Sequence, residues 1–275
     1  GDNVLLPEPY FPLYGPDVGL WGGDPRFYEC LFENEFVPTI EHLESLVDEN
    51  TVAILYNFPS NPTGATITIE QRDELLAFAQ RHDLWIITDE VYDRIVFDSE
   101  HVSFVGCDDE RVILINSFSK TYAMTGWRIG YIMSANKEAM NQMIKLQYYI
   151  TACSNDAMQY AVLTAINDAD DYPDEMCAEF KARRDLICSR LNKMPGVQCH
   201  VPEGAFYVFP KVEVPGMTSE EVAIELLKGG VLCSPGSAFG PSGEGHLRFA
   251  YTISREDISL GMNKTEAVLM RLRGD

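Results

Sequence analysis

The fold is decided by the stretch VILINSFSKTYAMTGWRIG, residues 112–130. Its first part, 112–116, is a short and mostly apolar run, which is typical of a strand buried on both faces of a sheet. The polar cluster Ser-Phe-Ser-Lys, 117–120, follows at once. A lysine just beyond a buried strand can be held away from water, which lowers its pKa and makes it a nucleophilic amine able to form a Schiff base. Lys120 is therefore a candidate catalytic residue, although a lysine in this position is usually an ordinary surface residue.

Apolar runs of the same kind lie on both sides of this stretch and alternate with segments of helical period. Strand–helix–strand alternation predicts an α/β fold with a mostly parallel central sheet and helices on both faces. In this part of the sequence we expect strands at 4–6, 27–32, 52–56, 84–88, 112–116 and 127–133, the last four of them buried, and helices at 39–47 and from Thr68 onward.

The pattern changes after about residue 135, where long helical segments take over. An acidic connection, 167–175, is either a linker or the N-terminus of a helix. We expect a large domain over residues 1–170 and a smaller C-terminal α+β domain, including an interdomain helix, over 171–275. The elements expected here are helices at 137–165 (broken near 152–155), 173–194, 219–228 and 255–272, and strands at 197–200, 205–210, 230–233 and 246–251.

Polar clusters follow three of the expected strands. They are 57–64, 89–92 and 117–120. Because ligands of open α/β sheets bind at the carboxyl ends of the strands, the three clusters predict a binding site at that edge of the sheet.

Several side chains in these clusters suit an anionic cofactor that contains a ring nitrogen. The hydroxyls of Ser117 and Ser119, with the guanidinium of Arg128, can together hold a phosphate. Asp89 ends an apolar strand, where a carboxylate is costly to bury without a partner. A protonated pyridine nitrogen would be such a partner, although an N-cap or a salt bridge would serve as well. Tyr92 can donate its phenol to an oxygen on the same ring.

Two further residues suit a substrate carboxylate. Arg248 alternates with apolar neighbours in the strand expected at 246–251, and an arginine there needs an anion. A carboxylate would serve through two parallel hydrogen bonds. Asn61 stands in the turn Asn-Pro-Thr-Gly, 61–64, which is a loop signal in any protein. Its amide, if held rigidly, can hydrogen-bond both a phenolic oxygen and a carboxylate.

The order of these motifs resembles the class I/II aminotransferases of fold type I. The resemblance covers essentially the whole chain, and the block 117–130 is its most specific part. The matching motifs are Asn-Pro-Thr-Gly (61–64), Thr-Asp-Glu-Val-Tyr (88–92), the block 117–130, Pro-Gly-Ser-Ala-Phe-Gly (235–240) and Leu-Arg-Phe-Ala (247–250).

The resemblance implies a cofactor, pyridoxal 5'-phosphate, and a role for each matching residue. Lys120 is implied to bind the cofactor covalently and to carry the proton, Asp89 to pair with the pyridinium nitrogen, and Arg248 to hold the α-carboxylate of the substrate. The other implied contacts are Tyr92 and Asn61 at the 3-oxygen, with Asn61 also at the substrate, Ser117, Ser119 and Arg128 at the phosphate, and Phe11, favoured over Tyr10 by its spacing to Tyr14, stacked on the ring.

The resemblance implies a ping-pong transfer of an amino group from an L-amino acid to a 2-oxo acid, in amino acid metabolism, by a homodimer with shared active sites. Measured against the usual family pattern, the sequence is expected to begin part-way through the fold, after an N-terminal arm, a first strand and a small-residue phosphate loop. Three alternatives stay open: a β-lyase, an enzyme like aminocyclopropane-carboxylate synthase, and a non-catalytic aminotransferase-like domain that senses a ligand.

Composition excludes other classes of function. The formal net charge is −21, from 42 acidic and 21 basic residues, and such a surface repels nucleic acid. No apolar stretch is long enough to cross a membrane, and no secretory signal opens the sequence, so we expect a cytoplasmic protein. The seven cysteines include no Cys-x-x-Cys pair, which favours free thiols over disulfides or a metal site.

Overall fold

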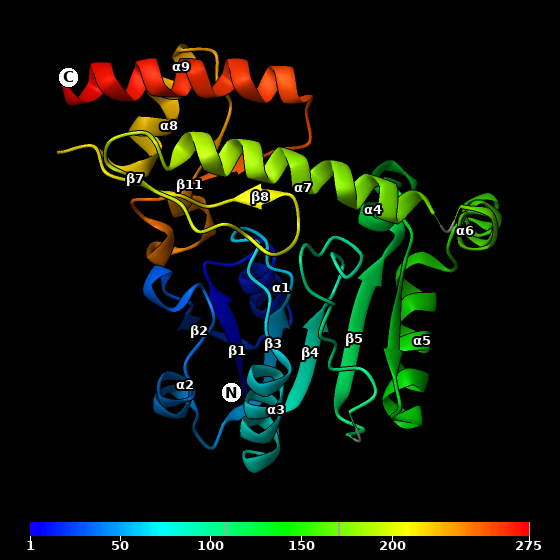
Figure 1. Cartoon of the computed structure of the whole chain (residues 1–275). Helices are drawn as coiled ribbons and strands as arrows, with labels where there is room; N and C mark the ends of the chain where they lie inside the picture. The colour runs from blue at the N-terminus through cyan, green and yellow to red at the C-terminus, as the bar shows by residue number, and fades with distance from the viewer. Residues whose placement is uncertain (108, 170, 275) are drawn as a thin grey trace.

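The main feature of the fold is a six-stranded sheet in the order β2-β1-β3-β4-β5-β6 (Figure 1). The computed structural model describes residues 1–107, 109–169 and 171–274. Every pairing in this sheet is parallel except that of β5 with β6, so the α/β fold class is confirmed. The strands are β1 (Asn3–Glu8), β2 (Asp24–Glu29), β3 (Thr51–Asn57), β4 (Trp85–Asp89), β5 (Val112–Ser117) and β6 (Gly130–Ser134).

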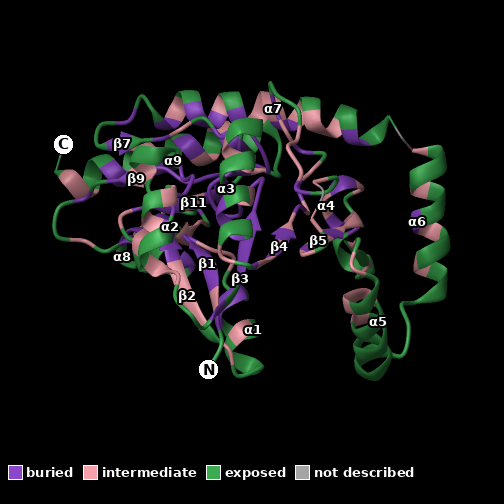
Figure 2. Ribbon diagram, turned by 90° about the horizontal axis from the view of Figure 1, so that it is seen from below, coloured by how far each residue is buried: buried purple, intermediate pink, exposed green. Residues whose placement is uncertain are grey.

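Helices cover both faces of this sheet. Helices α2 (Ile40–Leu46) and α3 (Ile69–Arg81) lie over one face and α1 (Tyr14–Leu20) over the other, as Figures 1 and 2 show. Successive strand residues point to opposite faces. Ile54 therefore packs in the cluster on the α2 and α3 side, while its neighbour Leu55 packs in the cluster on the α1 side. This is why the central strands read as continuous apolar runs.

Local capping sets where the helices begin. The Thr68 side chain accepts a hydrogen bond from the Gln71 amide, and the Gln71 side chain accepts one from the Thr68 amide. This capping box fixes the start of α3 where the sequence predicts it. Thr218 and Glu221 form the same arrangement at the start of α8 (Ser219–Lys228), whose bounds match the prediction.

The C-terminal part packs above the carboxyl ends of β3, β4 and β5 (Figure 1). Its helices α7, α8 and α9 surround a third buried cluster, the C-terminal cluster, which includes Ile187, Leu226, Phe249 and Leu269. Its elements are α7 (Tyr172–Leu191), β7 (Val197–Gln198), β8 (Tyr207–Val208), β9 (Lys211–Val212), α8, β10 (Ser234–Pro235), β11 (Leu247–Ala250) and α9 (Arg255–Arg273).

Two expected strands are wrong. The run 127–133 is not a buried parallel strand: Trp127 belongs to a short 3-10 turn, and β6 begins at Gly130, runs antiparallel to β5 and is largely exposed at the edge of the sheet. The run 230–233 is not a strand, because Gly230 has a φ of +82° where the chain turns away from α8, and Leu232 is exposed.

Other boundaries need smaller corrections. The strand expected at 27–32 ends at Glu29. The long helical segment is two helices, α5 (Lys137–Thr151) and α6 (Asp156–Asp168), with the break in the expected place. In the connection 167–175, α7 begins at Tyr172, and residue 170 lies outside the described residues. All seven cysteines are free, and Cys30, Cys188 and Cys199 are buried.

Candidate active site

A cavity of about 400 Å³ lies at the carboxyl ends of the parallel strands. The residues that line it come from the sheet and its loops and from the C-terminal part, so residues distant in sequence meet there. All nine residues singled out from the sequence line it, together with five others: the full set is Phe11, Tyr14, Asn57, Asn61, Asp89, Val91, Tyr92, Ser117, Ser119, Lys120, Thr125, Arg128, Tyr207 and Arg248.

Lys120 stands on α4 (Phe118–Thr121), the short helix that starts directly after β5. Its Nζ lies 5.7 Å from the ring centre of Tyr92 and 5.6 Å from that of Phe206. Burial lowers the pKa of this amine, and the positive charges of Arg128 and Arg248 lower it further, against the attraction of Asp89. The amine is therefore easier to deprotonate than an ordinary lysine, which is the condition for nucleophilic attack.

Asp89 is the last residue of β4 and faces the cavity. Its Oδ2 accepts a hydrogen bond of 2.6 Å from the Tyr14 hydroxyl, and its Oδ1 accepts one of 3.2 Å from the Val91 amide. Both partners are neutral. Burial raises the pKa of this carboxyl, which the two hydrogen bonds oppose. A carboxylate held in this way is suited to a cation that enters the cavity.

Arg248, on β11, lies between two aromatic rings. Its guanidinium carbon is 4.5 Å from the ring centre of Tyr207 and 4.6 Å from that of Phe239. Its Nη1 donates to the Asn61 side-chain oxygen at 2.8 Å, and Nη2 donates to the Ser234 hydroxyl at 3.3 Å. The buried Nε has no hydrogen-bond partner among the residues that the structure describes. An anion in the cavity would satisfy this donor.

Ser117, Ser119 and Arg128 also line the cavity. The Ser117 hydroxyl donates to the Ser119 hydroxyl at 2.7 Å, and it also accepts from the Ser119 amide at 3.0 Å, as the cap of α4. Arg128 follows a 3-10 turn with a φ of +55° and donates to the Thr125 carbonyl. Two hydroxyls and a guanidinium at the start of a helix make a set of donors for an anion.

Aromatic side chains complete the cavity wall. Tyr92 is buried, and its hydroxyl lies 3.0 Å from that of Tyr207. Phe11 lines the cavity and contacts Tyr14 edge-on. Tyr10 is stacked on Phe27, with ring centres 4.6 Å apart, and is not among the residues lining the described cavity.

Five residues that line the cavity had not been assigned a role from the sequence: Tyr14, Asn57, Val91, Thr125 and Tyr207. Asn57, the last residue of β3, donates to the Asp89 carbonyl at 3.0 Å and accepts from the Asn61 amide at 3.0 Å. Its position at a strand end was a usable signal. No sequence signal placed Tyr14 or Tyr207 at the cavity, because the contacts that bring them there join segments far apart in the sequence.

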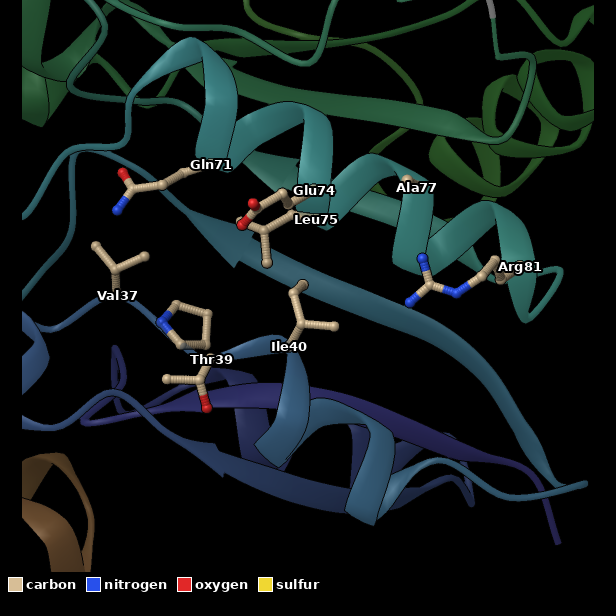
Figure 3. Close-up of a pocket in the computed structure, with 9 residues that line it drawn as sticks. Val37, Thr39, Ile40, Gln71, Glu74, Leu75, Ala77 and Arg81 are labelled. Carbon is tan, nitrogen blue, oxygen red and sulfur yellow. The ribbon is translucent and has the colours of Figure 1, made fainter.

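A second hollow lies away from this cavity. The groove in Figure 3 lies between α2 and α3, and its wall includes Ile40, Leu75 and Arg81 but no residue of the cavity described above. Over the described residues, no group of three or more His, Cys, Asp or Glu side chains is placed to hold a metal ion. In the same part of the chain, no helix is both long and apolar enough to cross a membrane.

Comparison with known proteins gives the family. The family model described as aminotransferase class I and II matches residues 1–263. An aspartate aminotransferase of Pyrococcus abyssi is 40% identical over 98% of this chain and 70% of the relative, and an aromatic-amino-acid aminotransferase of Thermococcus litoralis is 39% identical over the same shares. The solved aromatic aminotransferase of Pyrococcus horikoshii superimposes with a TM-score of 0.95 at 39% identity, over 98% of this chain and 74% of that one.

A fold, a site and relatives that agree in this way define a pyridoxal-phosphate-dependent enzyme. The chain belongs to the class I and II aminotransferases, whose members use pyridoxal 5'-phosphate as cofactor. The residues present fit that group: the Lys120 amine with its lowered pKa, the half-buried Asp89 carboxylate hydrogen-bonded to neutral donors, and hydroxyl and guanidinium donors share one cavity.

Proposed function

We propose that this enzyme transfers the amino group of an L-amino acid to a 2-oxo acid in two alternating half-reactions. The observation that carries the proposal is the position of Lys120 in one cavity with Asp89 and Arg248. The amine has a lowered pKa, the carboxylate is half-buried, and the guanidinium keeps a buried donor without a partner among the described residues.

Each of these three residues would then have its own role in the reaction. When bound, pyridoxal phosphate supplies an electron sink for the bonds of the substrate α-carbon. Lys120 Nζ would bind the cofactor and, once released from it, move the proton at the α-carbon. Asp89 would hold the ring nitrogen in its protonated form. Arg248 would hold the substrate α-carboxylate, with Asn61 beside it.

The remaining residues would orient the cofactor. Ser117, Ser119 and Arg128 would donate to its phosphate. Tyr92 and Asn61 would donate to its 3-oxygen, and Phe11 would pack on its ring. Their support is that all of them line the same cavity.

An acceptor-dependence assay tests the reaction. Aspartate, alanine and an aromatic amino acid are offered in turn, each with and without a 2-oxo acid such as 2-oxoglutarate, and both products are followed. The proposal predicts product only when the acceptor is present, with parallel lines in a double-reciprocal plot because the two half-reactions alternate. Release of pyruvate and ammonia from the aromatic amino acid without an acceptor, with loss of its β-substituent, would mean that the enzyme is a lyase and not a transaminase.

We also propose that the enzyme works as a homodimer in the cytoplasm. Free cysteines support the reducing compartment. Large apolar side chains left exposed on β6 and α5, among them Ile132, Met133 and Tyr149, support a partner over that side. Analytical ultracentrifugation checks the dimer, which Tyr149→Glu would weaken.

We propose in addition that the chain divides into a cofactor domain over 1–170 and a small domain over 171–275. Separate buried clusters in the two parts support the division, although Tyr92, Ile95 and Phe97 from the first part pack in the C-terminal cluster. Residue 170 itself lies outside the described residues. Limited proteolysis that cuts between α6 and α7 would support this boundary.

A further inference from the structure

Tyr14 is the first residue of α1, and its ring is almost completely buried under the sheet. Its hydroxyl donates to Asp89 Oδ2 over 2.6 Å, which is the distance of a strong bond to a carboxylate. The two residues are 75 positions apart, so α1 and the end of β4 are joined by this contact.

The same tyrosine also contacts the residue proposed to pack on the cofactor ring. The rings of Tyr14 and Phe11 lie edge to face, with centres 5.6 Å apart and an angle of 71° between their planes. Such pairs fix the relative orientation of two aromatic rings. Tyr14 therefore touches both the carboxylate and the phenylalanine on the cavity wall.

We propose that Tyr14 is a positioning residue that holds Asp89 as an oriented carboxylate and Phe11 as an oriented ring. The inference rests on the proposed function, because it concerns the two residues that would contact the cofactor ring. Tyr14 acts through them and need not touch the reacting atoms.

The charges around Asp89 give the direction of the effect. Burial and the neighbouring Glu90 raise its pKa, whereas the Tyr14 hydroxyl, the Val91 amide and the ammonium of Lys120 on α4 lower it. Burial is the largest of these influences. Removing the Tyr14 hydroxyl leaves burial less opposed, so Asp89 takes up its proton at a higher pH. A neutral carboxylic acid is a poor partner for a protonated ring nitrogen.

Tyr14→Phe isolates the hydrogen bond, because it keeps the ring against Phe11. Tyr14→Leu removes both contacts. Tyr28→Phe is the matched control: Tyr28 is also buried in the sheet, and its hydroxyl donates to the Leu55 carbonyl at 2.7 Å. The control loses a buried tyrosine hydroxyl of the same kind without touching Asp89.

The first measurement is a carbon-13 NMR titration of the Asp89 carboxyl in the full chain without cofactor. We expect its midpoint to rise by about one pH unit in Tyr14→Phe, the size that follows from losing one hydrogen bond to a charged group. Tyr28→Phe should keep the original midpoint. An unchanged midpoint in Tyr14→Phe would overturn the inference, as would an equal shift in the control.

The second measurement is the affinity for pyridoxal phosphate as a function of pH. In Tyr14→Phe the pH below which affinity for pyridoxal phosphate declines should rise by about the same amount. Affinity at acid pH then falls roughly 10-fold, with little change at higher pH. Tyr14→Leu should weaken binding at every pH. A uniform loss in Tyr14→Phe would mean that the hydroxyl only stabilises the fold. If the unaltered chain binds no cofactor, the proposed function fails, and the NMR titration still decides the role of Tyr14.

Discussion

The guanidinium of Arg248 donates to the side-chain oxygen of Asn61 over 2.8 Å, and this bond joins the turn after β3 to strand β11, 187 positions further along the chain. Asn61 is itself fixed through Asn57, which also bonds the Asp89 carbonyl. The proposed substrate clamp and the proposed ring-nitrogen partner thus belong to one hydrogen-bonded network. Such networks hold a site in place before its ligand arrives.

Replacing Arg248 should separate substrate binding from cofactor binding. Arg248→Ala removes the planar pair of donors, so KM for the amino acid should rise by roughly 100-fold or more, as expected for a lost charged hydrogen-bonding partner. Arg248→Lys should recover only part of this, because an ammonium cannot make two parallel bonds to a carboxylate. Steady-state kinetics and a cofactor titration check both variants. Equal losses in substrate and cofactor affinity would show that Arg248 is not a substrate clamp.

The Lys120 amine should titrate below an ordinary lysine. Burial is the main cause, and Arg128 is the larger of the two neighbouring positive charges that add to it. Arg128→Gln should therefore raise the pKa of Lys120, so that the amine becomes reactive only at higher pH. Reductive carbon-13 methylation followed by an NMR pH titration gives the value directly, without the cofactor. A lower or unchanged midpoint in Arg128→Gln would contradict the assigned electrostatics.

Gly236 should tolerate no side chain. A Cβ at this position would lie 1.9 Å from the Gly243 carbonyl oxygen and 2.6 Å from that of His246, both of them backbone atoms that cannot rotate away. Gly236→Ala should therefore destabilise the protein by about 2 kcal/mol or more, as overpacking does. Gly261→Ala is the control: apart from the neighbouring backbone of its own helix, no atom of the described residues lies within 4 Å of a Cβ added there. In the middle of α9 this change should stabilise the protein by up to about 1 kcal/mol. Urea unfolding of both variants tests the contrast.

Local pattern was enough to predict much of the fold. The runs around Ile54 and Ile86 are apolar because both faces of the sheet are covered, and Thr68 marks a helix start because its side chain caps the first turn. The polar clusters at the strand ends also predicted that Asp89 and Lys120 would share one cavity, because parallel strands end on the same side of the sheet.

The sequence pattern does not show which segments of the chain pack against one another. The apolar run near Ile132 gives a strand, but neither its antiparallel direction nor its place at the sheet edge. Leu232 stands in an apolar run that the turn after α8 leaves exposed. The Tyr14 hydroxyl reaches Asp89 because α1 packs against β1 and β2, and no spacing within either segment predicts that contact.

Trapping the cofactor on Lys120 tests the central claim most directly. The purified chain is incubated with pyridoxal 5'-phosphate, an absorbance band at about 360–430 nm is sought, and borohydride then converts the Schiff base to a stable amine before peptide mass mapping. We predict that one reduced cofactor is found on Lys120, and that both band and label are lost in Lys120→Ala and Lys120→Arg. A label spread over other lysines, or one that persists unchanged in these variants, would contradict the account.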